Sequence, residues 1–204
     1  MSAQFSTELF NHVLAAGKPA ASRSGVARRL LKNQEELGEV SEAFQALTDG
    51  INAKGKTPAD LAEEVADVYL VTTDALQQFL AYRALTHPAE AQRMADTARE
   101  HLGSVVAIAG EETFLGVYVA LCKRHGLAFE LAHACDTGYA GDIDADLGIQ
   151  LMLMQTLSST LLITAYPGMP YTSYEALQED VRHTVNRKIA KWLRVRAAAT
   201  QKAA

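Results

Sequence analysis

Two short acidic clusters contain seven acids, and four of these stand where the helical pattern of this chain calls for apolar side chains. The clusters occupy residues 35–42 and 63–67, and each contains two carboxylates three positions apart. That spacing places both members of a pair on one side of a helix. Any fold for the chain must therefore explain why these acids share helix faces with apolar residues. The pairs are Glu36 with Glu39, and Glu64 with Asp67.

The first pair falls on the apolar side of its helix. Each residue of an α-helix is rotated by about 100° from the last. This rotation places Glu36 inside the apolar stripe and Glu39 at its edge. It places Glu35 and Glu42 on the opposite, solvated face. The stripe is formed by Leu30, Leu37, Val40, Phe44 and Leu47.

The second pair has the same relation to the next helix. Glu64 falls inside the stripe and Asp67 at its edge, while Glu63 points away. The stripe is formed by Leu61, Val68, Val71, Ala75 and Phe79. Because a buried isolated carboxylate is costly, such a group normally neutralises, pairs or binds metal. On packed helices the four acids would form a cup of oxygen ligands that suits Mg²⁺, with Mn²⁺ as a substitute ion.

A simpler interpretation treats the acids as a solvated helix face. Glu is a good helix former, and acidic runs commonly face water. This explains Glu35, Glu42 and Glu63 well, but it explains Glu36 and Glu64 badly. On this interpretation the chain is a non-catalytic helical interaction module.

The rest of the sequence also predicts helices, so we expect one all-α domain over residues 1–204. No stretch shows a convincing strand alternation. Thr57, Pro58 and Asp60 form a typical helix start, with a cap, a first-turn proline and a first-turn acid. Helices are expected at about 6–16, 22–48, 57–85, 88–102, 111–124, 127–135, 145–165 and 173–196.

The last helix carries a cation on its apolar side. Lys188 falls within a stripe formed by Leu177, Val181, Val185, Ile189 and Trp192. A lysine in such a position often snorkels to the edge of the apolar surface. Here its ammonium group could also pair with the inward carboxylates or with a phosphate. Asn186, Arg187 and Lys191 flank it.

Composition and charge limit the class of protein. The net charge of −5 argues against a nucleic-acid partner, and no apolar run approaches a membrane span. Residues 1–6 lack the basic and apolar parts of a signal peptide, and two cysteines form no disulfide framework. We therefore expect a cytoplasmic protein. The apolar residues of 151–163 favour a core helix or a subunit interface.

Two other groups of potential ligands have simpler explanations. Cys122 and Cys135 stand near His125 and His133, but the spacing matches no known zinc finger and favours buried cysteine. The acidic segment 136–148 lacks the glycine and glutamate positions of a calcium loop, so we interpret it as a turn with a helix cap.

The sequences around the acidic pairs resemble those of a known family. Glu-Glu-Leu-Gly-Glu-Val-Ser-Glu-Ala begins at Glu35, and Glu-Glu-Val-Ala-Asp-Val begins at Glu63. The later run Val-Asn-Arg-Lys-Ile begins at Val185. In their order and spacing, these sequences resemble the all-α nucleotide pyrophosphohydrolases of the MazG-like superfamily.

This resemblance covers about residues 22–80 and 173–195. It implies a MazG-like helical bundle that forms a homodimer or a homotetramer. The catalytic core would comprise about 22–85 and 173–196, with additional helices inserted at about 88–166, before the last helix.

The activity that the resemblance implies is Mg²⁺-dependent hydrolysis of a nucleoside triphosphate between its α and β phosphates. The products are the monophosphate and pyrophosphate, which suits nucleotide-pool control. Metal ligands would be Glu36, Glu39, Glu64 and Asp67. Glu36 or Glu35 would orient or deprotonate the attacking water, and Lys188 would contact the leaving phosphates. Weaker candidates for substrate contacts are Asn186, Arg187, Lys54 and Lys56.

Two further polar residues have open roles. Asn33 lies one turn before Glu36 and could read a base edge or the ribose, although a satisfied core amide explains it better. Asp74 lies one heptad after Asp67, on nearly the same side, and could equally be a solvated or capping acid.

The preferred nucleotide stays open, with weak grounds for a purine such as dGTP or GTP. A dimeric dUTPase, which takes dUTP and dUDP, shares the paired carboxylates and is the nearest rival. A phosphoribosyl-ATP pyrophosphohydrolase is a weaker one. A di-iron bundle would need two Glu-x-x-His pairs, and the sequence has one, Glu130 with His133.

Overall fold

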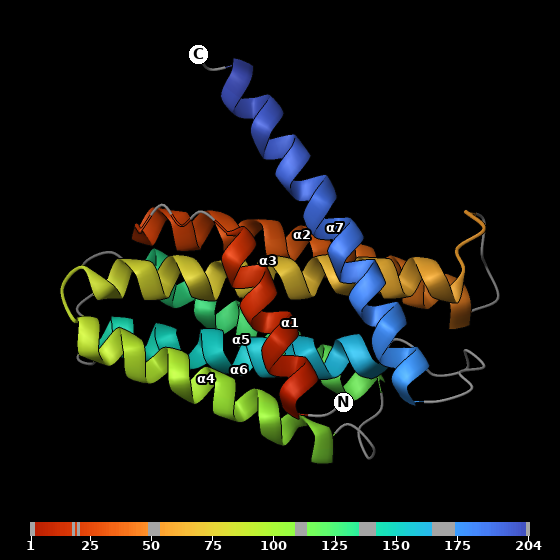
Figure 1. Cartoon of the computed structure of the whole chain (residues 1–204), viewed down its shortest axis with the longest axis horizontal. Coiled ribbons are helices and arrows are strands. Elements are labelled where there is room, and N and C mark those ends of the chain that lie inside the picture. Colours follow the sequence, from red (N-terminus) through yellow and green to blue (C-terminus); the bar gives the residue numbers. More distant parts are fainter. Residues whose placement is uncertain are drawn as a thin grey trace.

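The computed structural model describes residues 3–17, 19, 21–48, 54–108, 114–134, 142–164 and 174–202. Within these residues there are helices and no strands, which confirms the predicted all-α class (Figure 1). The helices are α1 (Ala3–Ala16), α2 (Arg23–Thr48), α3 (Pro58–Ala84), α4 (Pro88–Ile108), α5 (Phe114–His133), α6 (Ile143–Thr164) and α7 (Tyr174–Lys202).

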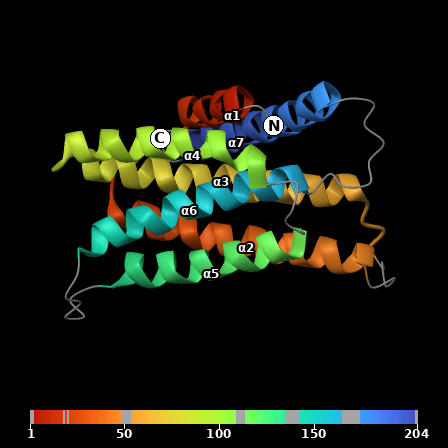
Figure 2. The ribbon, with the colours of Figure 1, turned by 90° about the horizontal axis from the view of Figure 1, so that it is seen from below.

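Four helices form the central bundle. α2 packs against α3, α3 against α6, α6 against α5 and α5 against α2, so the four close a ring around the core (Figure 2). Residues from all four meet in this core, among them Leu30, Leu76, Phe79, Leu121 and Leu151. The segment predicted as an insertion therefore supplies α5 and α6, two of the four bundle helices.

The remaining helices cover one side of the bundle. α4 lies along α3 and α6, and α1 packs on α3 and α4. α7 crosses α3 and contacts α1, and its C-terminal half extends beyond the edge of the bundle (Figure 1). This crossing brings the last helix against the acidic stretch of α3.

The start of α3 agrees with its sequence signals. The Thr57 hydroxyl accepts a hydrogen bond from the Asp60 N–H at 3.2 Å, and Asp60 accepts one from the Thr57 N–H at 2.7 Å. Such a reciprocal cap satisfies N–H groups that have no partner inside the helix. Gly55, just before the cap, has a φ of +65°, which glycine adopts without strain.

α5 is longer than predicted. The sequence indicated two helices that break near Gly126, whereas the structure has one continuous helix. Buried Leu121 and Ala128 lie on either side of this glycine and keep the same face toward the bundle. Their packing outweighs the cost of a helical glycine, about 1 kcal/mol. α7 likewise continues to Lys202, beyond its predicted end at 196.

α6 is a core helix. Leu147, Leu151, Met154, Leu161 and Leu162 are buried inside the chain, which explains the apolar segment 151–163 without a subunit interface. Among the described residues, α6 is also the one helix that is long and apolar enough to cross a membrane by length and composition. The expectation that no apolar run approaches a membrane span was therefore wrong for α6, although more than half of its apolar window is buried inside the structure.

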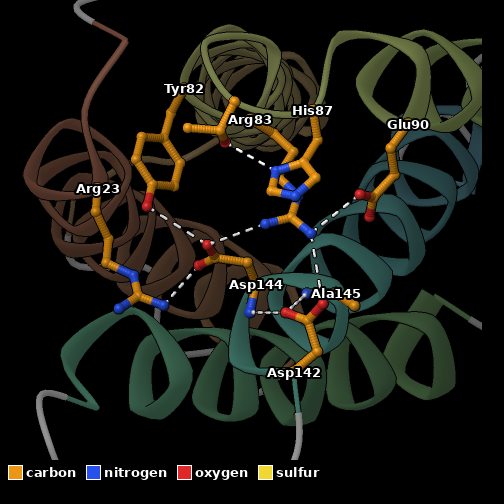
Figure 3. A network of polar contacts seen from close by, with 9 residues as sticks. Arg23, Tyr82, Arg83, His87, Glu90, Asp142, Asp144 and Ala145 are labelled. Carbon is orange, nitrogen blue, oxygen red and sulfur yellow. Dashed lines mark hydrogen bonds and ion pairs between the residues drawn. The ribbon is translucent and has the colours of Figure 1, made fainter.

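A polar network fixes the start of α6 to the end of α3 (Figure 3). Buried Arg83 pairs with Glu90 at 3.0 Å and with Asp142 and Asp144 at 3.4 Å. The Asp142 carboxylate accepts from the N–H groups of Asp144 and Ala145, both at 3.1 Å, as the predicted cap requires. This network holds the corner where α3, α4 and α6 meet.

Candidate metal centre

Three of the four predicted ligands converge where α2 packs on α3. One carboxylate oxygen each from Glu36, Glu64 and Asp67 lies within 4.8 Å of the other two. Glu36 is buried at 5% exposure, and the other two are half-buried. All three donors are carboxylate oxygens, the type that Mg²⁺ and Mn²⁺ prefer, so the residues fit the predicted ion.

The fourth predicted ligand lies at the rim. Glu39 is exposed, and its carboxyl group contacts that of Glu64. Partial burial, followed by the charge of Glu64, raises the pKa of Glu39. Glu39 thus adds negative charge beside the three-carboxylate cluster without belonging to it.

Glu36 is the most deeply buried acid of the cluster. Burial raises the pKa of Glu36, as does the charge of Asp67, although a hydrogen bond from Lys32 at 2.7 Å opposes the shift. Burial is the largest cause of the shift, and the charge of Asp67 adds repulsion in the same direction. A bound divalent cation would relieve this repulsion.

Lys188 reaches the cluster from α7. Its ammonium group lies 2.5 Å from Asp67 and 3.5 Å from Glu63, and the side chain is 8% exposed. Burial alone would lower the pKa of Lys188, but the hydrogen bond and charge of Asp67 raise it. Glu63 was predicted to point away, yet it faces α7 and also pairs with Arg187 at 2.5 Å.

Of the other residues predicted to contact the substrate, one lies at the cluster and the others lie away from it. Lys56 pairs with Glu64 at 3.0 Å and so touches the cluster. Lys54 instead pairs with Glu42 on the outer face of α2. Asn186 is exposed and lines a separate hollow against α1, away from the cluster. Glu35 is exposed, where it pairs with Lys32 at 2.9 Å.

Asn33 occupies a structural position. Its side chain is fully buried between α2 and α3, where Nδ2 donates to the Thr72 hydroxyl at 2.7 Å. It does not line the cavity beside the cluster. The alternative role predicted for it, a satisfied core amide, is met in part: Nδ2 is hydrogen-bonded, whereas the buried Oδ1 has no hydrogen-bond partner within the described residues.

A cavity of about 290 Å³ opens from the cluster between α2, α3 and α7. Glu36, Asp67 and Lys188 line one end of it. Arg29 and Trp192 also line the cavity, and neither was predicted as a site residue. Their signal was periodicity: Arg29 stands seven positions before Glu36, and Trp192 stands four after Lys188, so each shares a helix face with its partner.

Asp74 belongs to the same cavity. It is 1% exposed and forms an ion pair with Arg29, so it is neither a solvated nor a capping acid. Its spacing from Asp67 correctly indicated a shared helix face. Its burial could not be predicted because the covering α7 comes from a distant part of the chain.

The zinc alternative gains no support from the described part of the chain. The His125 ring nitrogen Nε2 lies 2.8 Å from the carbonyl oxygen of Leu30, and burial lowers the pKa of this histidine. Cys135 lies outside the described residues. Within them, the one group of three or more metal-binding side chains is the carboxylate cluster.

Comparisons with protein-family models, with curated proteins and with solved structures found no match.

Proposed function

We propose that the chain is a Mg²⁺-dependent hydrolase that converts a nucleoside triphosphate to the monophosphate and pyrophosphate. The observation that carries the proposal is the cluster of Glu36, Glu64 and Asp67, placed beside Lys188 at one end of a cavity. Carboxylates with a nearby cation suit a metal-bound polyphosphate, because each part of the ligand then meets opposite charge. The MazG-like bundle and the homo-oligomer belong to the same proposal.

Glu36, Glu64 and Asp67 would hold the ion, with Glu39 at the rim. A bound Mg²⁺ supplies positive charge that binds phosphate oxygens and neutralises the charge that develops as the anhydride bond breaks. Lys56, paired with Glu64, limits the negative charge of the cluster on the side toward the α2–α3 loop.

Glu36 is the proposed acceptor for the proton of the attacking water. It is the buried acid of the cluster, so its carboxylate would lie beside the ion that binds the water. The water oxygen bonds to the α-phosphorus, the α–β anhydride bond breaks, and pyrophosphate leaves. Glu35 is less suitable because it is exposed and lies outside the cluster.

Lys188 is the proposed contact for the leaving pyrophosphate. Its raised pKa keeps the ammonium group charged at neutral pH. In the absence of substrate it donates to Asp67. A phosphate oxygen in the cavity is negatively charged like the Asp67 carboxylate, so it would be a second acceptor for Lys188. Such charge-assisted hydrogen bonds are strong.

The test is pyrophosphate release by the purified protein with Mg²⁺. The panel comprises the canonical dNTPs and NTPs, together with dUTP and dUDP, since turnover of dUDP would favour the dUTPase alternative. The site variant is Glu64→Gln with Asp67→Asn, and the matched control is Glu35→Gln with Glu42→Gln on the exposed face. We expect metal-dependent release by the parent and the control and none by the site variant. No turnover of any nucleotide by the parent would refute the proposal.

A further inference from the structure

The cavity beside the cluster extends well beyond the carboxylates. On α3 it is lined from Asp67 to Asp74, seven residues later, which corresponds to about 10 Å along a helix. On α2 it is lined over the same span in the opposite direction, from Glu36 back to Arg29. The cavity therefore has a carboxylate-cluster end and a second end that the hydrolysis of phosphates does not use.

The middle of the cavity combines apolar walls with cations. Leu70 and Val71 of α3 form one wall, and the half-buried ring of Trp192 contributes another from α7. Lys32, which pairs with Glu36, lines the cavity near the carboxylate cluster, and Lys191 lines it from α7. Cations, apolar side chains and an indole along one groove suit a ligand that is both anionic and aromatic.

Asp74 and Arg29 define the second end. Asp74 is buried and pairs with Nε of Arg29, and Gln78 donates to the other Asp74 oxygen at 3.3 Å. The ion pair holds the guanidinium of Arg29 at the cavity wall, although its buried Nε makes no hydrogen bond within the described residues. An arginine fixed in this way presents its remaining donors as a planar fork.

We propose that this second end binds the base of the nucleotide and selects guanine. The base would stack on Trp192, and Arg29, positioned by Asp74, would donate to the O6 and N7 acceptors of guanine. Adenine carries an amino donor in place of O6 and cannot accept both hydrogen bonds. This inference rests on the proposed function only in taking a nucleotide as the ligand.

Trp192 provides a direct readout because it is the single tryptophan of the chain. The probe is dGMP, which is a product and is not turned over, titrated against the fluorescence of Trp192 in the full chain. We expect a saturable change with dGMP. With dAMP, the same change in Trp192 fluorescence should require concentrations roughly 5- to 150-fold higher, because a bidentate base contact contributes about 1–3 kcal/mol of discrimination.

Arg29→Lys tests the guanine contact without removing the charge that Asp74 needs. The lysine keeps an ion pair with Asp74 but lacks the planar fork, so we expect a folded protein that no longer prefers dGMP to dAMP. Arg28→Lys, the same change at the adjacent exposed position, should keep the preference. Equal affinities of the parent for dGMP and dAMP, or an unchanged preference in Arg29→Lys, would overturn the inference.

The two proposals fail in different ways. Pyrophosphate release without a change in Trp192 fluorescence would overturn the base site and leave the hydrolase proposal standing. A selective dGMP response in a protein that hydrolyses no nucleotide would keep the base site and refute the hydrolase.

Discussion

Lys188 of α7 donates to Asp67 of α3 at 2.5 Å, across 121 positions of sequence. Asp67 is also one of the three clustered carboxylates. A cation bound by the cluster and the ammonium group of Lys188 would therefore act on the same carboxylate. The last helix thus contributes both to the shape of the site and to its charge.

Replacing Lys188 with Met should change metal binding and catalysis in opposite directions. Without the ammonium group the cluster is more negative, so Mg²⁺ should bind several-fold more tightly. Turnover should fall by roughly 10- to 150-fold, because a charged hydrogen bond contributes about 1.5–3 kcal/mol. Titration calorimetry and steady-state kinetics measure the two effects. Weaker Mg²⁺ binding together with unchanged turnover would show that Lys188 only packs α7 against the bundle.

Replacing Glu36 with Gln should stabilise the metal-free protein at neutral pH. Burial raises the pKa of Glu36 above its unfolded value, so the folded chain holds this proton more tightly than the unfolded chain. The resulting stability is fully present below the unfolded pKa, about 4.3, and is lost as the pH rises through the folded pKa. The Tm of the variant should therefore exceed that of the parent at pH 7–8 and approach it near pH 4.

Thermal melts in a chelator at several pH values provide this measurement. Added Mg²⁺ should then raise the Tm of the parent much more than that of Glu36→Gln. The interpretation fails if the Tm difference between the two proteins does not depend on pH.

Replacing Arg83 with Met should reduce stability and leave catalysis unchanged. Arg83 is buried among Glu90, Asp142 and Asp144 (Figure 3). Its loss should lower the free energy of unfolding by about 2–3 kcal/mol. It lies sixteen positions after Asp67, about 24 Å along α3, so pyrophosphate release per folded molecule should remain.

Urea unfolding monitored by circular dichroism measures the effect of Arg83→Met. The control is Arg99→Met, which removes a more exposed i,i+3 pair with Asp96 and should cost under about 1 kcal/mol. Equal losses for the two variants would mean that the buried network has no special role in stability.

Two glycine-to-alanine changes should have opposite effects. Gly126 is helical and exposed, and a Cβ there would meet nothing within 4 Å, so Gly126→Ala should stabilise by about 1 kcal/mol. At Gly148 a Cβ would lie 2.1 Å from Met94 Cε and 2.8 Å from Phe79 Cε1, so Gly148→Ala should destabilise. Urea midpoints distinguish the two. A destabilising Gly126→Ala would indicate that α5 is broken there, as the sequence alone had indicated.

The correct predictions from sequence depend on local information. The burial of Glu36 follows from helical phase, and the cap at Thr57 follows from residues that are neighbours in the chain. The continuity of α5 through Gly126 does not follow from local sequence, because it depends on packing against α2 and α6.

The details of the site depend on which helices meet. Glu63 is partly covered because α7 brings Arg187 and Lys188 to it. Asp74 is buried because Arg29 of α2 pairs with it in the groove that α7 helps to enclose. The carboxylate spacing was therefore enough to predict the cluster. The cavity could not be predicted from the sequence, because it depends on which helices pack together.

The most direct test of the account is a calorimetric titration of Mn²⁺ and Mg²⁺ into three proteins. These are the parent, the cluster variant Glu64→Gln with Asp67→Asn, and the exposed-face variant Glu35→Gln with Glu42→Gln. Both variants remove two negative charges, so they differ in position alone. The account predicts saturable binding by the parent and the exposed-face variant, and none by the cluster variant. Equal weakening in both variants, or no binding by the parent, would contradict it and make the acids an ordinary charged surface.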